Sequence, residues 1–398
     1  MQTKKASLIP LLFGSYYVIF FYGSYIALLG FMLPQIKADF NVSYTASGLV
    51  FLLPLVPGIF GNFFAGYIFT KFDRKKVLIG ICTLMIIVYL LLPLSSSYFI
   101  FLVFNLLLST IVNLMNTMSN ITISDVFTLK YPRYRDNGIL MVHFLFSFGS
   151  VLAILLGDIL FESKVTWRTI FLIDALISLP VLILFLFSKY PDLKGNSISG
   201  ISLKDVTALL YNRKMIFFLI CALFYVGAED GIVNWTSTFL ENGHGHGKSF
   251  SSLALMLFFI LFASGRLLGV LFIQKLNPVR AILVLIGLGA SSVALEVFTG
   301  LTLFGVDVFI PFCGILLSIV FPTIQNLLIK EFKDNISVAT GILFAASSVG
   351  GTLMTFLIGV SNDFIGDKYG FVIISVYLVM VVPFLVSIRY NGHGAPDR

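Results

Sequence analysis

Residues 215–240 read MIFFLICALFYVGAEDGIVNWTSTFL, an apolar run with two adjacent carboxylates, Glu229 and Asp230, near its middle. Such a run is long enough for a helix that crosses a bilayer, which takes about 20 residues. A charge at that depth costs at least ~2.5–3.5 kcal/mol on insertion scales, so acids in these segments usually have a function. The stretch therefore predicts a membrane-spanning helix whose carboxylates face protein or a polar cavity.

The composition extends this prediction to the whole chain. Of the 398 residues, 58% are hydrophobic and 11% are charged, and the mean hydropathy is +1.00. Soluble domains carry roughly 25% charged residues, so this chain cannot cover a water-facing surface and must be partnered by a lipid bilayer. The net charge of +7 fits basic cytoplasmic loops. We therefore expect no nucleic-acid partner.

Charges and turn residues divide the chain into two sets of six expected spans. The first set covers 8–36, 43–70, 77–94, 98–127, 137–160 and 168–188, and the second covers 214–240, 249–275, 279–300, 306–330, 336–361 and 369–389. Lys4 and Lys5 precede an uncharged run that is too long for a signal peptide, so the first span is expected to be retained. The predicted organisation is a six-helix bundle over 1–190, a cytoplasmic linker over 191–213 with a short surface helix near 201–210, and a second six-helix bundle over 214–398.

The distribution of basic residues predicts the orientation. With the N-terminus inside, most lysines and arginines fall in cytoplasmic segments. The outer loops keep only Lys37, Lys164, Arg168, Lys248 and Lys368. This asymmetry predicts a multi-pass protein of the cell membrane with both termini in the cytoplasm.

The two halves resemble one another in sequence. Asp136-Asn137 precedes a span that contains Gly149, and Asp334-Asn335 precedes a span that contains Gly350, roughly 200 residues later. Repeated halves with a site between them at mid-membrane describe a secondary transporter. The predicted fold class is an all-α integral membrane protein of twelve helices in two pseudo-symmetric six-helix bundles, expected to be monomeric.

The loop 66–76, GYIFTKFDRKK, resembles the signature loop of the major facilitator superfamily, as does the segment WRTIF at 167–171. Glycine lets helices approach closely, and a basic cluster can pair with a helix terminus. The resemblance implies gating or structural roles for Gly66, Asp73, Arg74 and Lys75. Thr70 and Asp73 replace the acid and the turn glycine that are usual in this loop.

Further segments resemble the fucose permease branch of sugar–proton symporters in that superfamily. They are YVGAE at 225–229 with Trp235, GRLLG at 265–269, FPT at 321–323, and His143 following Asn120. The resemblance implies alternating access, proton coupling and a sugar-like solute. The acids that this branch commonly carries late in span one and on span four are absent here, where 29–34 reads LGFMLP and Asn116 takes the second place.

Polar residues recur every three or four positions along the expected fourth span: Thr110, Asn113, Thr117, Asn120 and Ser124, with Asn116 beside them. They are either interhelical hydrogen-bonding groups or neutral donors and acceptors for a hydroxylated solute. On the second interpretation, the predicted substrate-binding residues are Asn113, Asn116, Thr117, Asn120, Asn234, Trp235, Gln325 and Asn326. For Trp235 the alternative is a place at the outer interface.

Glu229 is the leading proton carrier, because a carboxyl in apolar surroundings can take up and release a proton. Glu229 and Asp230 are about 100° apart around their helix, so they are not expected to face one cavity equally. Asp230 and His143 are further proton-coupling candidates. Arg266, nearer the cytoplasmic side, is expected to have a gating or structural role without pairing directly with Glu229.

Several kinds of site are not expected. Cys82, Cys221 and Cys313 all lie in apolar spans, which argues against disulfides. His244 and His246 lack further ligands, so 242–248 is interpreted as a flexible outer loop and no metal is expected. No nucleophile–base motif indicates an enzyme. We therefore predict proton-coupled uptake of a sugar or similar small polar solute, with no cofactor beyond an ion gradient. The alternatives are proton-driven efflux of amphipathic, drug-like compounds or lipids, and a non-transporting solute sensor.

Overall fold

The computed structural model describes residues 8–190, apart from 56, 59–64, 66, 67 and 70, and residues 203–273 and 277–390. Eleven helical segments in this part of the chain are long and apolar enough to cross a membrane. The expected second span, 43–70, lies partly outside the described residues. The prediction of an all-α, multi-pass membrane protein is confirmed.

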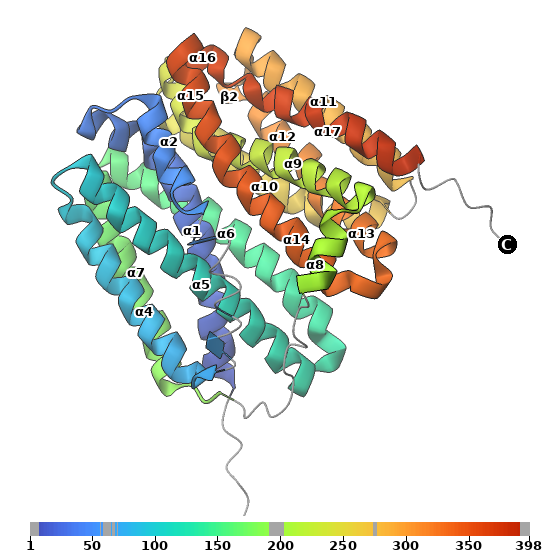
Figure 1. The fold of residues 1–398 in the computed structure, drawn as a ribbon. Helices are drawn as coiled ribbons and strands as arrows, with labels where there is room; N and C mark the ends of the chain where they lie inside the picture. The colour runs from blue at the N-terminus through green and yellow to red at the C-terminus, as the bar shows by residue number, and fades with distance from the viewer. Residues whose placement is uncertain are drawn as a thin grey trace, which may run out of the picture. The chain divides into compact units, whose positions relative to one another are not determined.

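The chain forms two compact units, which Figure 1 shows in one view. Unit 1 comprises Met1–Phe40 and Val56–Ser197, and unit 2 comprises Asn41–Leu55 and Ile198–Arg398. The predicted boundary between bundles fell in the linker 191–213, of which 191–202 lie outside the described residues. The assignment of Asn41–Leu55 to unit 2 differs from the predicted division, because α2 (Tyr44–Leu52) packs on α15 (Thr355–Ile365) of unit 2.

Unit 1 is arranged around its first helix. Its elements are α1 (Ile9–Phe40), α4 (Arg74–Leu91), η1 (Leu92–Leu94), α5 (Tyr98–Lys130), η2 (Pro132–Tyr134), α6 (Arg135–Glu162) and α7 (Trp167–Phe187). The 3₁₀ turn η1 contains Pro93 and divides α4 from α5, as the sequence predicts. Helix α1 packs on α5, α6 and α7, and α4 packs on α5 and α7.

Unit 2 contains more, and shorter, elements. They are α2 (Tyr44–Leu52), α8 (Leu203–Leu210), α9 (Arg213–Thr238), η3 (Phe239–Gly243), α10 (Lys248–Ile273), α11 (Pro278–Thr299), β1 (Thr302–Leu303), β2 (Val306–Asp307), α12 (Phe309–Leu317), α13 (Val320–Glu331), η4 (Lys333–Asn335), α14 (Ile336–Val349), η5 (Gly350–Met354), α15 (Thr355–Ile365), α16 (Asp367–Gly370) and α17 (Ile373–Tyr390). Helix α9 packs on α14, η5 and α17. The predicted short helix in the linker is present as α8.

Glycines bring the central helices of each unit together in the same way. In unit 1, an added Cβ at Gly23 of α1 would lie 2.0 Å from the Phe146 carbonyl oxygen of α6, and one at Gly149 would lie 2.0 Å from the Phe20 oxygen of α1. In unit 2, a Cβ at Gly350 of η5 would lie 2.0 Å from the Leu223 oxygen of α9. Only glycine fits such contacts, so the repeat predicted around Gly149 and Gly350 has a structural basis.

The expected tenth span, 306–330, differs in two respects. Its first residues belong to a hairpin in which Thr302 pairs with Asp307 and Leu303 pairs with Val306. The turn residues Phe304 and Gly305 both have positive φ, which is the geometry of a tight two-residue hairpin turn. The helix that follows is also interrupted, because α12 ends at Leu317 and α13 begins at Val320.

Candidate functional site

The two carboxylates of α9 face different neighbours within unit 2. The Arg266 guanidinium of α10 lies 3.9 Å from Glu229 Oε1. Asp230 instead points at η5, where a Cβ added to Gly351 would lie 2.1 Å from its Oδ2. The two carboxylates therefore point to different sides of α9, as expected. Of the two, Glu229 is the one paired with a basic side chain.

The ion pair between Arg266 and Glu229 corrects the expectation that they do not meet. That expectation compared how deep the main-chain positions of Arg266 and Glu229 lie in the membrane. It neglected the direction in which the long Arg266 side chain points. Side chains on a helix lean toward its N-terminus, and the Arg266 guanidinium lies over the Phe262 ring, 4.3 Å from its centroid and one turn back along α10. This direction brings the charge toward Glu229.

A break in the helix next to α10 supplies acceptors to the same group of side chains. Arg266 Nε donates to the Ser318 carbonyl oxygen at 3.4 Å, and the Tyr225 hydroxyl donates to the Leu317 carbonyl oxygen. Pro322 explains why the Ser318 oxygen is free, since proline has no N–H to bond the carbonyl four residues earlier. Tyr225 also lies within hydrogen-bonding reach of Glu229. Glu229, Arg266, Tyr225 and the break between α12 and α13 form what we call the α9–α10 polar site.

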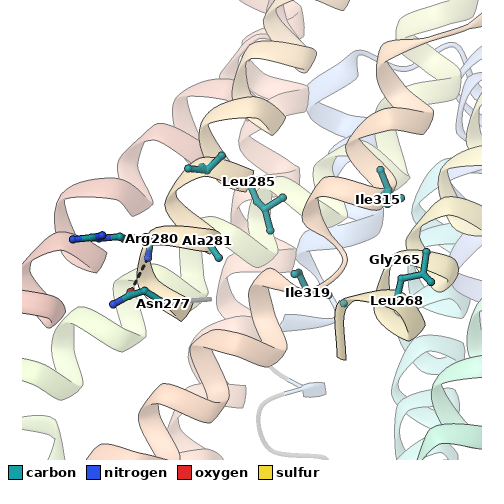
Figure 2. Close-up of a pocket in the computed structure, with 10 residues that line it drawn as sticks. Gly265, Leu268, Asn277, Arg280, Ala281, Leu285, Ile315 and Ile319 are labelled. Carbon is teal, nitrogen blue, oxygen red and sulfur yellow. Dashed lines mark hydrogen bonds between the residues drawn. The ribbon is translucent and has the colours of Figure 1, made fainter. Parts of the chain in front are cut away.

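An apolar cavity of about 650 Å³ lies against the same stretch of α10 (Figure 2). Gly265 and Gly269, on either side of Arg266, line it together with Leu268, Leu285, Ile315 and Ile319. Gly269 is in tight contact with the segment between α12 and α13, because an added Cβ would lie 2.0 Å from Ile319 Cγ2. Asn277 and Arg280 are the polar residues of its lining.

The predicted polar stripe in unit 1 lies on α5, with Asn113, Asn116, Thr117 and Asn120 all half-buried. Asn113 Nδ2 donates to the Ser109 carbonyl at 2.8 Å. Its Oδ1 accepts from the Tyr22 hydroxyl of α1 at 3.1 Å. Asn120 Nδ2 donates to both the main-chain oxygen and the Oδ1 of Asn116, at 2.9 and 3.1 Å. Part of the stripe is thus hydrogen-bonded within unit 1, and each member keeps some exposed surface.

The remaining substrate-binding candidates are scattered. Trp235 is fully buried, and its Nε1 donates to the Thr355 carbonyl at 2.9 Å. Asn234 is 8% exposed, Gln325 is half-buried and Asn326 is exposed. The enclosed indole gives no support to solute stacking on Trp235. His143 lies in α6, but its side chain is outside the described part of the chain.

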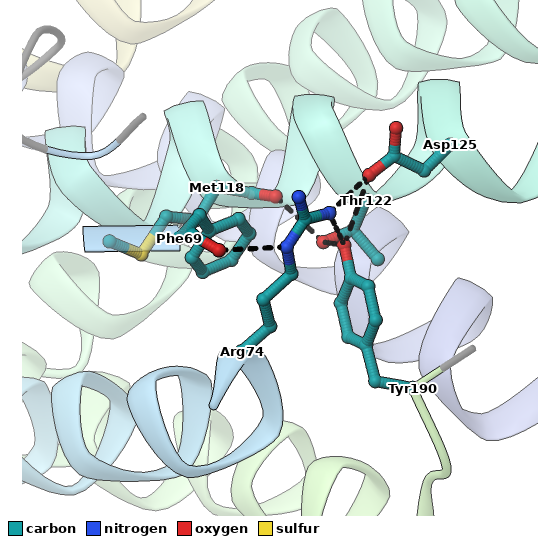
Figure 3. A network of polar contacts seen from close by, with 6 residues as sticks. All are labelled: Phe69, Arg74, Met118, Thr122, Asp125 and Tyr190. Atoms are coloured by element: carbon teal, nitrogen blue, oxygen red, sulfur yellow. Dashed lines mark hydrogen bonds and ion pairs between the residues drawn. The ribbon is translucent and has the colours of Figure 1, made fainter. Parts of the chain in front are cut away.

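The basic loop before α4 forms a network within unit 1 (Figure 3). Arg74 Nη1 lies 2.6 Å from Asp125 Oδ2 of α5, and Arg74 also donates to the Phe69 carbonyl and the Tyr190 hydroxyl. Burial is the main cause that raises the pKa of Tyr190, so its hydroxyl keeps its proton at neutral pH. The sequence indicated the arginine but did not indicate Asp125 as its partner.

The neighbouring residues of this loop act at helix ends. Asp73 caps α4 by accepting from the Lys76 N–H at 2.9 Å. Lys75 Nζ donates to the Leu186 carbonyl at 2.8 Å, at the C-terminal end of α7, where a cation is favoured by the helix dipole. Gly66 lies outside the described residues. The loop therefore contributes a cap, a helix-end cation and an internal ion pair.

Two buried acids of spanning helices were missed at the sequence level. Asp174 of α7 is 5% exposed and Glu296 of α11 is 1% exposed. Each has a carboxyl oxygen without a hydrogen-bond partner in the described part of the chain. Both lie inside predicted spans, so the rule that singled out Glu229 also applied to them. In the same described ranges, no group of three or more His, Cys, Asp or Glu side chains is arranged to hold a metal ion.

The comparison with family sequence profiles matches residues 15–355 to the Major Facilitator Superfamily. The chain belongs to the Major Facilitator Superfamily, and it is therefore a multi-pass membrane transporter. Among curated proteins, no sequence matches it. The resemblance seen in the loop 66–76 is thus confirmed at the level of the superfamily.

Solved structures share its fold at low sequence identity. The nucleoside transporter NupG is 17% identical with a TM-score of 0.75, covering 96% of this chain and 98% of its own. A D-xylose-proton symporter is 14% identical with a TM-score of 0.74, covering 98% and 99%. The superfamily transporter FucP, in the outward conformation, is 18% identical with a TM-score of 0.61, covering 95% and 98%. At these identities the likeness establishes the fold.

Proposed function

We propose that this transporter takes up a small hydroxylated solute, such as a sugar or a nucleoside, together with protons by alternating access. The observation that carries the proposal is the ion pair between Arg266 and Glu229, 3.9 Å apart. Charges inside spanning helices mark substrate and proton pathways in membrane proteins. The names of two structures of the same fold, a nucleoside transporter and a D-xylose-proton symporter, agree with this solute class.

Glu229 is proposed to carry the proton. When it is ionised, it pairs with Arg266, and the two charges neutralise one another in surroundings that penalise either charge alone. A proton on Glu229 removes the attraction, and the guanidinium then keeps its bond to the Ser318 carbonyl. A solute hydroxyl can donate to the ionised carboxylate or accept from the released guanidinium. Solute binding and proton binding thereby depend on the same two side chains.

The amides of α5 are proposed to bind the solute in unit 1. Asn113, Asn116 and Asn120 offer both donors and acceptors without net charge, which suits a neutral polyhydroxylated molecule. Their existing bonds orient the side chains, since Asn120 is held by Asn116 and Asn113 by Tyr22.

The basic residues of the loops support the proposal that both termini are cytoplasmic.

Uptake into proteoliposomes under an imposed inward proton gradient tests the proposal. We expect labelled sugars or nucleosides to accumulate, and the Glu229→Gln variant to lose accumulation while still exchanging solute down its gradient. Glu331→Gln is the matched control, because it removes a carboxyl paired with Lys214 elsewhere in unit 2. No solute movement, or unchanged accumulation by Glu229→Gln, would contradict the mechanism. Binding without counterflow would favour a sensor.

A second candidate function is efflux of amphipathic compounds. The observation in its favour is the cavity of about 650 Å³, whose lining is mainly apolar and includes the glycines beside Arg266. An aliphatic chain could occupy such a cavity with a polar group directed at the α9–α10 polar site. Expression in drug-sensitive cells would show raised resistance to lipophilic cations if this function is correct, and unchanged resistance if solute uptake is the function.

A further inference from the structure

A second group of titratable side chains gathers at one end of unit 2, outside the α9–α10 polar site. Its members are Glu296 near the end of α11, Asp307 at the end of β2, and His244 and His246 in the segment between η3 and α10. The carboxylates are almost fully enclosed, with 1% exposure for Glu296 and 4% for Asp307. Neither acid has a role in the transport proposal.

The two carboxyl groups face one another. Asp307 Oδ1 accepts from the Ile310 N–H at 2.8 Å and so anchors the start of α12. The Asp307 carboxyl also lies within hydrogen-bonding reach of the Glu296 carboxyl. Oε2 of Glu296 has no hydrogen-bond partner in the described part of the chain. Two ionised carboxylates are both acceptors, so a bond between them requires a proton.

The other groups around the pair do not neutralise two negative charges. The Cys313 thiol of α12, which donates to the Gly289 carbonyl, lies within electrostatic range of both acids. His246, after η3, lies within electrostatic range of Asp307. Lys368 of α16 lies close enough to His244 to act on it through its charge. Carboxyl pairs in such surroundings hold one proton between them, because adjacent like charges cannot both be desolvated.

The histidine segment is packed, in contrast to the flexible loop that the sequence suggested. The His244 ring lies 4.9 Å from the Phe239 ring, edge to face, and the His246 ring lies 4.0 Å from the Phe250 ring. His244 is also within hydrogen-bonding reach of the Glu296 main-chain carbonyl, while its Nε2 has no partner in the described residues. The His244 imidazole is therefore held next to the main chain of Glu296.

We propose that Glu296 and Asp307 form a proton-binding site that fastens the β1–β2 hairpin and the start of α12 to α11. With the proton bound, one carboxyl donates to the other and the hairpin is held. When the proton leaves, the two carboxylates repel one another and the hairpin separates from α11. The ligand of this site is a proton from the adjoining water, and no covalent chemistry is involved.

The direction of the pH effect follows from Asp307. Burial raises the pKa of this carboxyl, so the closed arrangement binds more protons than the open one. Its contribution to closure is complete below the ordinary pKa of about 3.9 and is lost as the pH rises through the raised value. His244 acts in the opposite sense, since burial lowers its pKa and its contribution is lost as the pH falls through the lowered value.

Hydrogen–deuterium exchange of the purified, full-length protein tests the site without any transport measurement. After correction for the intrinsic pH dependence of exchange, we expect amides of residues 301–310 to lose about tenfold protection as the pH rises from 5 to 9. In Glu296→Gln, the side-chain amide donates to Asp307 and needs no titratable proton to do so. The hairpin should therefore remain protected at every pH. Protection in the wild type that does not change with pH would overturn the proposal.

Two further variants separate the site from simple loss of folding. Asp307→Asn keeps an oxygen for the Ile310 N–H and gains a donor for Glu296, so it should also abolish the pH step. Glu241→Gln is the control, because Glu241 is an acid of the adjacent η3 that pairs with Lys248 at 3.3 Å, and it should retain the wild-type response. A pH step that survives in both Glu296→Gln and Asp307→Asn would also overturn the proposal.

Discussion

The two units share a packing geometry and differ in the chemistry placed beside it. In unit 1, α1 and α6 approach through Gly23 and Gly149, and in unit 2, α9 and η5 approach through Gly350. In unit 1, α1 also meets neutral amides of α5, where Tyr22 bonds Asn113, whereas in unit 2, α9 also meets a charge on α10, where Glu229 pairs with Arg266. The backbone contact is set by helix geometry, while the side chains next to it are free to diverge.

The largest effect on function is expected in unit 2. Glu229→Gln leaves the Arg266 guanidinium without its counter-charge, and loss of one partner of a buried pair costs about 3–5 kcal/mol. Because both side chains keep about a fifth of their surface exposed, at 24% and 19%, we expect a stability loss at the lower end of that range. Without the proton carrier, we expect accumulation to fall to the level reached without a pH gradient. A flux assay with and without a pH gradient measures it. If Asn120→Ala in unit 1 lost accumulation to the same extent, the proposal that proton coupling depends on unit 2 alone would be wrong.

The glycine contacts test the shared part of the comparison. Gly350→Ala and Gly149→Ala each place a methyl group 2.0 Å from a main-chain oxygen, and overpacking of this kind costs about 1–3 kcal/mol. We expect both variants to lower the melting temperature by several degrees and by similar amounts. Gly341→Ala is the control, because nothing lies within 4 Å of an added Cβ there. Unequal losses would show that the two contacts are not equivalent.

The sequence predicted the shared geometry better than the distinct site. Apolar runs and the spacing of Gly149 and Gly350 are local or periodic signals, and eleven of the twelve predicted spans correspond to long apolar helices in the described part of the chain. The pairing of Arg266 with Glu229 depends on the direction of a long side chain and on a helix break, which no spacing reveals. Pro322 was visible, but its effect on the Ser318 carbonyl becomes clear only when Arg266 is seen to bond it.

The amide stripe is expected to give a smaller effect. Replacing Asn113 with alanine removes a group that bonds Tyr22 and Ser109, and a neutral hydrogen bond contributes about 1 kcal/mol. If the stripe binds solute, we expect about fivefold weaker apparent affinity with maximal uptake retained. Tyr22→Phe is the matched control, since it removes the same bond from the other side. If both variants lower only the melting temperature, the stripe joins helices and does not bind solute.

The smallest effect is expected from the ion pair between Arg74 and Asp125, which lies 2.6 Å apart with side chains 20% and 29% exposed. Partly exposed pairs contribute about 0–1 kcal/mol and are screened by salt. Asp125→Asn should therefore lower the melting temperature by only a few degrees, with the difference from wild type shrinking at high salt. Glu331→Gln, which breaks the pair with Lys214 in unit 2, should behave alike. If instead Asp125→Asn stops uptake at unchanged stability, the network around Arg74 takes part in the transport cycle. Both units would then contain an ion pair that transport requires, and the proposed difference between them would be wrong.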